Sequence, residues 1–406
     1  MKKENEIKTV VPALRFLEFQ GMIGWEKTYI YEECPNPYSG GTPKTTEKKY
    51  YGGNIPFIRS AEIGKDKTEL SITQEGLNNS SAKMIQKGDL LIALYGANSG
   101  DIAISKIDGA INQAILCLKA KSNNLFIYYT LLKKQKDIVS RYLQGGQGNL
   151  SGEIIKSIDF YIPQEIEQQK IANCLSSLDD LIEATAQKVE TLKEHKKGLM
   201  QRLFPAEGKN VPDLRFLEFQ GAEEWKESSL DEYFDFKQGF QCPVEEQYDK
   251  QEHGMVRFIR IIDLTQPSTP YRYINDPGNQ YYINKENLFM VRYGDPGLVG
   301  IGYEGIIANN LFQLIPKKKI NPYFFYFLFS KEKTRIKGLS SSTSLSAINF
   351  TSLKALKIVV SQNTDEQQKI ADCLSSIDEL IEVISRKVEI LKEHKKGLMQ
   401  QLFPKI

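Results

Sequence analysis

Two arginines occupy matching places in two halves of the sequence that are otherwise different. Arg59 ends the run FIR, and Arg260 ends a second FIR run. A guanidinium group can donate two hydrogen bonds to the edge of a guanine, so each arginine is a candidate reader of DNA bases. An arginine in a strand is more often a structural or surface residue, and the sequence leaves both interpretations open.

Further candidates for DNA contact are basic and small polar residues in, or just before, turns and loops rich in glycine or serine. Lysine and arginine attract the phosphate backbone, while loop N–H and hydroxyl groups can bond phosphate oxygens. The alternative is a solvated helix face followed by an ordinary loop, but the pattern recurs in both halves. In the first half these residues are Gly41, Thr42, Lys44, Lys133, Lys134, Lys136, Arg141, Gln147 and Asn149. In the second half they are Lys237, Gln238, Lys333, Arg335, Lys337, Ser341 and Thr343.

Residue types that support catalysis are present, but they are not arranged for it. His195 and His394 are equivalent residues of two repeats and His253 stands alone, so the histidines form neither a catalytic group nor a metal site. The sequence has no GxxxxGK[ST] loop for nucleotide phosphates and no Asn-Pro-Pro-aromatic motif for a flipped adenine. Scattered cysteines without a CxxC pair support neither a zinc site nor a disulfide framework. We therefore expect no catalytic residue, metal or cofactor on this chain.

Acidic pairs are found in both copies of a long repeat, as Asp179-Asp180 and Asp378-Glu379. Adjacent side chains on a helix point in different directions, so neither pair can readily share one metal ion. We expect both pairs to lie on solvated helix faces.

Length and composition describe a soluble protein with more than one domain. The 406 residues exceed one ordinary core, and 41% hydrophobic with 26% charged residues is typical of globular proteins. The net charge of +2 excludes a general polycation, so any DNA-binding surface must be local. No apolar run is long enough to span a membrane, and the first residues lack the apolar core of a signal peptide. The expected location is the cytoplasm.

Two internal repeats divide the sequence into constant and divergent parts. VPALRFLEFQG at 11–21 recurs as VPDLRFLEFQG at 211–221, and the segment 167–205 recurs at 366–404 with most positions identical. The parts between the repeats share almost no continuous identity. Two nearly constant segments thus alternate with two divergent modules.

The long repeats are predicted to be helices that pair through an apolar seam, because no proline interrupts them and apolar residues recur in steps of three and four. The seam residues are Ile171, Leu175, Leu178, Ile182, Val189, Leu192, Leu199, Ile370, Leu374, Ile377, Ile381, Val388, Leu391 and Leu398. Lys196 and Lys395 also fall in the seam, where a polar residue can set the register of two helices. A pseudo-twofold relation would make the helices antiparallel within one chain, and pairing between two chains is the alternative.

The divergent parts are predicted to be α+β modules. Each contains short runs typical of strands, such as 55–63 and 89–96 in the first module, and one strongly apolar helix, at 125–132 and 321–329. Asn321-Pro322 is a favourable N-cap and first-turn pair for the second of these helices.

Landmarks recur in the two modules in the same order, as expected for one fold with two different surfaces. Tyr95 corresponds to Tyr293, and Asn112-Gln113 corresponds to Asn309-Asn310. The expected organisation is a first module at 1–163, a first long helix at 164–205, a second module at 206–361 and a second long helix at 362–406.

The repeated helical segments and the start of the first module carry a family resemblance. YIPQEIEQQKIANCLSSLDDLIE, repeated as VVSQNTDEQQKIADCLSSIDELIE, resembles the helical repeats of type I restriction-modification specificity subunits. GGTPKTTEKKYYGGNIPFIRSAEI is similar to the first segment of their target-recognition domains. The resemblance covers essentially the whole chain, although the second module has KQGFQCPVEEQ in place of the GGTP segment.

The resemblance implies two target-recognition domains separated by two long helices that form an antiparallel intramolecular coiled coil. It implies that each domain reads one half of a split site in double-stranded DNA and that the helices set the distance between the halves. It also implies two methylation subunits that carry S-adenosylmethionine, and restriction subunits that use ATP and Mg²⁺, as partners. The specificity subunit itself would do no chemistry and would have no membrane partner.

Two other functions stay open from the residues. A self-sufficient modification or cleavage enzyme would act on DNA alone when S-adenosylmethionine or magnesium is added. A coiled-coil scaffold without a role on nucleic acid would not bind duplex DNA, and the basic segments before both loops argue against it only mildly.

Overall fold

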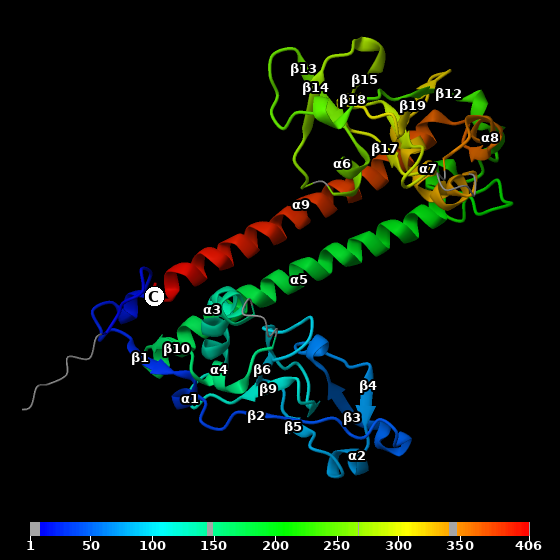
Figure 1. The fold of residues 1–406 in the computed structure, drawn as a ribbon. Helices are drawn as coiled ribbons and strands as arrows, with labels where there is room; N and C mark the ends of the chain where they lie inside the picture. The colour runs from blue at the N-terminus through cyan, green and yellow to red at the C-terminus, as the bar shows by residue number, and fades with distance from the viewer. Residues whose placement is uncertain (1–8, 144–148, 267, 341–346, 406) are drawn as a thin grey trace, which may run out of the picture. The chain divides into compact units, whose positions relative to one another are not determined.

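The chain folds into two compact units, and each unit contains part of both long helices. The first unit comprises Met1–Ala186 with Arg386–Ile406, and the second comprises Gln187–Ser385. The computed structural model describes residues 9–143, 149–266, 268–340 and 347–405 (Figure 1). The unit boundaries cut across the four segments expected from the sequence, because each unit takes the first part of one long helix and the last part of the other.

The first unit is built from three small sheets and the helices that accompany them. The sheets have the strand orders β2-β9-β6-β7, β4-β3-β8-β5 and β1-β10, and β3 runs parallel to β8. The strands are β1 Glu26–Tyr29, β2 Tyr38–Ser39, β3 Tyr51–Ile58, β4 Leu70–Ile72, β5 Lys83–Ile85, β6 Leu90–Ala93, β7 Ile102–Ile104, β8 Gly109–Ile111, β9 Ile115–Leu118 and β10 Asp159–Ile162. The helices are α1 Ile30–Glu33, α2 Gln74–Asn78, α3 Asn124–Leu143, α4 Gly152–Lys156, the first part of α5 Glu165–Leu203 and the last part of α9 Thr364–Leu402.

The second unit repeats this topology with different strand lengths and loops. Its sheets have the orders β12-β19-β16-β17, β14-β13-β18-β15 and β11-β20, and β13 runs parallel to β18. The strands are β11 Lys226–Ser229, β12 Phe234–Gln238, β13 Met255–Ile259, β14 Arg272–Asn275, β15 Tyr282–Ile283, β16 Leu288–Val291, β17 Val299–Gly300, β18 Gly305–Ile307, β19 Leu311–Pro316 and β20 Lys357–Val360. The helices are α6 Ile261–Thr265, α7 Pro322–Lys337, α8 Phe350–Ala355, the last part of α5 and the first part of α9. The expectation of one fold for both modules is confirmed.

Local sequence explains where the module helices begin. Asn321 precedes α7, and its side chain accepts a hydrogen bond from the backbone N–H of Phe324 at 3.0 Å, which is the N-cap expected from the sequence. The helix α3 extends well beyond the apolar run that predicted it. The expected strand at 55–63 ends earlier, because β3 stops at Ile58 and a 3₁₀ turn, Ser60–Glu62, follows.

Each unit has an aromatic core that includes the end of a long helix. In the first unit the rings of Trp25 and Phe126 lie 5.7 Å apart, and Phe403, just after α9, packs at 6.0 Å and 5.5 Å from them. In the second unit Phe204, just after α5, packs in the same way against the equivalent tryptophan and phenylalanine. The core of the first unit is therefore completed by the end of α9, and the core of the second unit by the end of α5.

The long helices run antiparallel within each unit. In the first unit the start of α5, at Ile171 and Leu175, shares a core with the end of α9, at Met399 and Leu402. In the second unit the end of α5 shares a core with the start of α9. The α+β fold with an intramolecular antiparallel helix pair is confirmed. None of the helices in the described residues is long and apolar enough to cross a membrane.

Candidate nucleic-acid interface

A buried carboxylate ties the leading repeat of the first unit to the first turn of α5. Glu167 accepts hydrogen bonds from Arg15 Nε at 2.9 Å and Nη2 at 2.7 Å, and from Trp25 Nε1 at 3.2 Å. The hydrogen bonds to Glu167 raise the pKa of Arg15, so the guanidinium stays charged. The pairing satisfies a charge that burial alone would destabilise.

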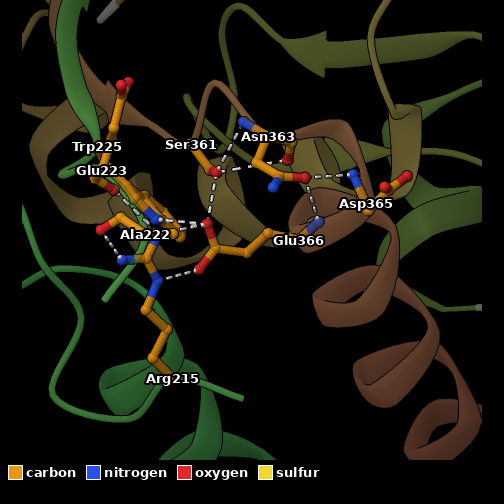
Figure 2. A network of polar contacts seen from close by, with 8 residues as sticks. All are labelled: Arg215, Ala222, Glu223, Trp225, Ser361, Asn363, Asp365 and Glu366. Atoms are coloured by element: carbon orange, nitrogen blue, oxygen red, sulfur yellow. Dashed lines mark hydrogen bonds and ion pairs between the residues drawn. The ribbon is translucent and has the colours of Figure 1, made fainter. Parts of the chain in front are cut away.

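Figure 2 shows the equivalent network in the second unit. Glu366 accepts from Arg215 Nε at 2.6 Å and Nη2 at 3.0 Å, from Trp225 Nε1 at 3.1 Å, and from Ser361 Oγ at 2.6 Å. The side chain of Asn363 accepts from the backbone N–H of Glu366 at 3.2 Å and so caps the start of α9. These duplicated networks form a common framework on which the loops of the two units differ.

In the first unit, a set of loops brings the predicted Gly41-Thr42 turn beside the landmark residue Gln113. Thr42 Oγ1 donates to Gln113 Oε1 at 2.8 Å, and both Thr42 and Lys44 are exposed. The turn needs glycine, because a Cβ at Gly40 would lie 1.8 Å from the backbone oxygen of Ile111.

Residues 149–150 contact the same group of loops through Leu94. Leu94 N–H donates to Ala114 O at 2.8 Å, and Leu150 N–H donates to Leu94 O at 2.9 Å. We call residues 40–44, 94–95, 112–114 and 149–150 the first loop cluster.

The second unit contains an equivalent second loop cluster, defined by residues 237–239, 292–293, 308–310 and 347–348. Gln238 accepts from Arg292 Nη1 at 2.8 Å, and its amide donates to the backbone oxygen of Asn309. Tyr293 OH donates to Asn309 Oδ1 at 3.1 Å, and Ile348 N–H donates to Arg292 O at 3.0 Å. A polar surface assembled from the same four loops thus presents different side chains in the two units.

Sequence reasoning missed several residues of these clusters as site residues. Gln113, Tyr293 and Asn309 were recognised only as landmarks that align the modules. Arg292 was not singled out, although it directly precedes one of these landmarks. These landmarks are polar and directly follow short strand-like runs, a position that indicates a candidate site residue.

The two predicted base-reading arginines make structural ion pairs. Arg59 bonds the buried Glu62 at 3.0 Å and the exposed Glu69 at 2.5 Å, and Arg260 bonds the buried Asp263 at 3.1 Å. In each case the acid also accepts the arginine's own backbone N–H and so caps the following turn. This local role accounts for the recurrence of FIR, and base reading by these arginines stays a prediction.

Two lysines of α3 donate hydrogen bonds to backbone oxygens outside the first loop cluster. Lys133 Nζ donates to the backbone oxygens of Phe403 and Pro404 at 2.9 and 2.7 Å, and Lys134 Nζ donates to Asp159 O at 2.6 Å. Burial and the neighbouring Lys134 lower the pKa of Lys133. A DNA-binding role for this pair stays a prediction beside the structural one.

Two basic residues of α7 pair with an acid in the loop that follows Tyr293 of the second loop cluster. Lys333 bonds Asp295, in the loop after Tyr293, at 2.6 Å, and Lys337 lies 3.9 Å from the same carboxylate. Arg335 pairs with Glu332 on its own helix at 3.3 Å.

The remaining predicted contacts are distributed as follows. Lys237 donates to the backbone oxygen of Gln280, and Lys136 and Asn149 are exposed. Arg141 belongs to α3. Gln147, Ser341 and Thr343 lie outside the described residues.

The predicted seam residues are all buried or half-buried along α5 and α9. One member of each acidic pair is half-buried and has a partner on the other long helix. Asp179 and Asp378 each accept a hydrogen bond from a lysine of the other long helix, whereas Asp180 and Glu379 are exposed. Among the described residues there is no group of three or more His, Cys, Asp and Glu side chains placed to hold a metal ion.

Two modules of one topology, joined by duplicated helices and carrying divergent loop clusters, define a class of two-surface recognition proteins. The family model "Type I restriction modification DNA specificity domain" matches this chain twice, at residues 22–194 and 222–393. The chain therefore belongs to the family of type I restriction-modification DNA specificity subunits.

Individual relatives agree with this family. A putative type I restriction enzyme MjaX specificity subunit from Methanocaldococcus jannaschii is 28% identical, over 92% of this chain and 96% of its own length. The MjaVIII specificity subunit from the same organism is 26% identical, over 79% of each chain. The crystal structure of a type I S subunit from M. genitalium has the same fold, with a TM-score of 0.67 at 18% identity over 98% of this chain and 100% of that one.

Proposed function

We propose that each loop cluster reads one half of a bipartite site in double-stranded DNA, and that α5 and α9 set the distance between the halves. One observation supports this proposal most directly. The two units share one topology, but their four equivalent loops carry different polar side chains. Hydrogen-bonding side chains such as Gln113 in the first unit, and Arg292 and Asn309 in the second, are the types that read base edges. Two different surfaces on equivalent scaffolds suit two different half-sites.

We further propose that the chain is a non-catalytic adaptor. Two methylation subunits carrying S-adenosylmethionine would dock on the long helices, and restriction subunits using ATP and Mg²⁺ would join that core in the cytoplasm. A chain without its own active site needs such partners, and a protein with two equivalent units suits two copies of one partner.

The test is to express the chain with candidate methylation subunits and to sequence methylated adenines in DNA exposed to the complex. The expected result is a split motif with a fixed gap. Exchanging one module for that of a relative would change only one half of the motif. A continuous motif, or an unchanged motif after the exchange, would refute the proposal.

Single substitutions sharpen this test. Gln113→Ala is expected to relax the first half-site and Asn309→Ala the second, each by about 5- to 150-fold in discrimination at one base pair. Lys156→Ala is the matched control, because this lysine pairs with Glu153 on the exposed surface of α4, outside the first loop cluster. Relaxation of both half-sites by one substitution would contradict the assignment of one reader to each unit.

A self-sufficient enzyme is the competing function. The purified chain would then modify or cut DNA when S-adenosylmethionine or magnesium is added, without a partner. The proposed adaptor is inactive alone and active with methylation subunits, and its DNA affinity falls steeply with salt.

A further inference from the structure

Each long helix has one lysine in the apolar seam, and each of these lysines pairs with an aspartate of the opposite helix. In the second unit, Lys196 Nζ lies 2.6 Å from both carboxylate oxygens of Asp378. In the first unit, Lys395 Nζ lies 2.5 Å from Asp179 Oδ1. The lysine side chains are only 18% and 15% exposed.

An aromatic residue of the adjoining recognition module covers each pair. The ring centroid of Phe327, on α7, lies 4.9 Å from Lys196 Nζ, and that of Tyr129, on α3, lies 5.2 Å from Lys395 Nζ. Both aromatic side chains are buried. Tyr129 OH also donates to Asp179 at 2.8 Å, a bond that Phe327 cannot make. Each pair therefore contacts both long helices and one module.

The pairs select one direction for the two helices. Lys196 and Lys395 are equivalent residues of the repeat, and so are Asp179 and Asp378. A parallel arrangement in equivalent register would place lysine beside lysine and aspartate beside aspartate, which is repulsive. Only the antiparallel arrangement matches each lysine with an aspartate.

The pairs also select one register. A slip of one helix by a single turn, about 5.4 Å, would separate both pairs at once and leave the two largely buried lysines without their partners. The apolar seam alone resists such a slip less strongly, because leucine and isoleucine recur along it. Polar residues in apolar seams act in this way when they specify register more than stability.

We propose that the pairs Lys196–Asp378 and Lys395–Asp179, with their covering aromatic residues, are positioning residues that fix the direction and register of α5 against α9. This inference rests on the proposed function in one respect, which is that the register determines the gap between the two half-sites. The covering aromatic residues connect each module directly to this register.

Charge reversal of the Lys196–Asp378 pair is the sharpest test. The side chain of Phe327 makes no hydrogen bond to this pair, whereas Tyr129 donates one to Asp179 in the other pair. Lys196→Asp and Asp378→Lys each place like charges face to face, and the double variant restores an opposite-charge pair. Methylation at the parental gap is expected to fall about tenfold or more in each single variant, and to recover to within about threefold of the parent in the double variant.

A second readout uses the chain without DNA. Spin labels at Thr191 and Val383, which are exposed residues of α5 and α9 in the second unit, report the register as an interlabel distance. The parent and the double variant are expected to give one narrow distance, and the single variants a broadened or shifted one. The matched control is Lys193→Asp, because Lys193 pairs only with Glu190 of its own helix among the described ion pairs and is exposed.

The outcomes separate the two proposals. If the single reversals match Lys193→Asp in both readouts, or if the double variant is no better than the worse single variant, the pairs do not set the register. If the parent complex methylates no split site, the proposed function fails, and the spin-label distances still decide the register inference.

Discussion

Removing Arg215 is expected to destabilise the second unit strongly. The Arg215 side chain is 9% exposed and that of its partner Glu366 is 1% exposed, so Arg215→Met leaves a buried carboxylate whose remaining side-chain donors among the described residues are Trp225 and Ser361. Breaking a buried ion pair from one side costs about 3–5 kcal/mol, and the remaining donors favour the lower end. For a unit of this size the loss corresponds to about 6–12 °C in Tm.

Differential scanning calorimetry of the full chain measures this effect. The transition of the second unit should move below that of the first unit and become separate from it. Adding Glu366→Gln should recover part of the loss, because the buried group is then neutral. Lys209→Met is the matched control, since its pair with Asp213 lies in the same connecting segment but is exposed. A fall in Tm no larger than that of the control would refute the reasoning.

Further predictions concern single residues. Burial raises the pKa of the Cys34 thiol to about 12, so Ellman's reagent at pH 8 should modify Cys34 only upon unfolding. Because an unfolded thiol ionises near pH 9 while the folded one does not, Cys34 should lower stability as pH rises from about 9 to 12, and Cys34→Ala should flatten the stability–pH curve there. Asn321→Ala removes the N-cap of α7 and should cost about 1 kcal/mol in urea unfolding. Gly40→Ala should lower Tm, because its Cβ would meet Ile111 O, whereas Gly198→Ala inside α5, with open space around it, should stabilise the protein by about 0.5–1 kcal/mol.

The architecture could be predicted because its signals are local or repeated. The apolar periodicity of the long repeats is a property of neighbouring residues, and the structure places helices at Glu165–Leu203 and Thr364–Leu402. The N-cap at Asn321 depends on a residue only three positions away. One local signal was overlooked, since an acid three residues after each FIR arginine indicates a capped turn.

The contacts of the basic residues could not be predicted, because their partners are distant in the sequence. Lys133 donates to backbone oxygens 270 and 271 residues further along, which only the folded first unit brings together. The loop clusters depend in the same way on short strands whose pairing is set by the whole module. The partners of Asp179 and Asp378 are lysines of the other long helix, and the pattern of one helix alone does not reveal them.

The duplicated structure separates bonds that both units share from contacts that differ between the units. A residue that is identical in both units and makes the same bond in each cannot distinguish two different half-sites. Arg59 and Arg260 share such a bond, since each caps the next turn through an acid three positions on, and base reading by either one stays a prediction. The loop clusters do not, because Thr42 and Gln113 pair in one, whereas Gln238 and Arg292 pair in the other. Exchanging the cluster residues should therefore change the DNA sequence that is read, while exchanging one FIR arginine for lysine should mainly lower stability.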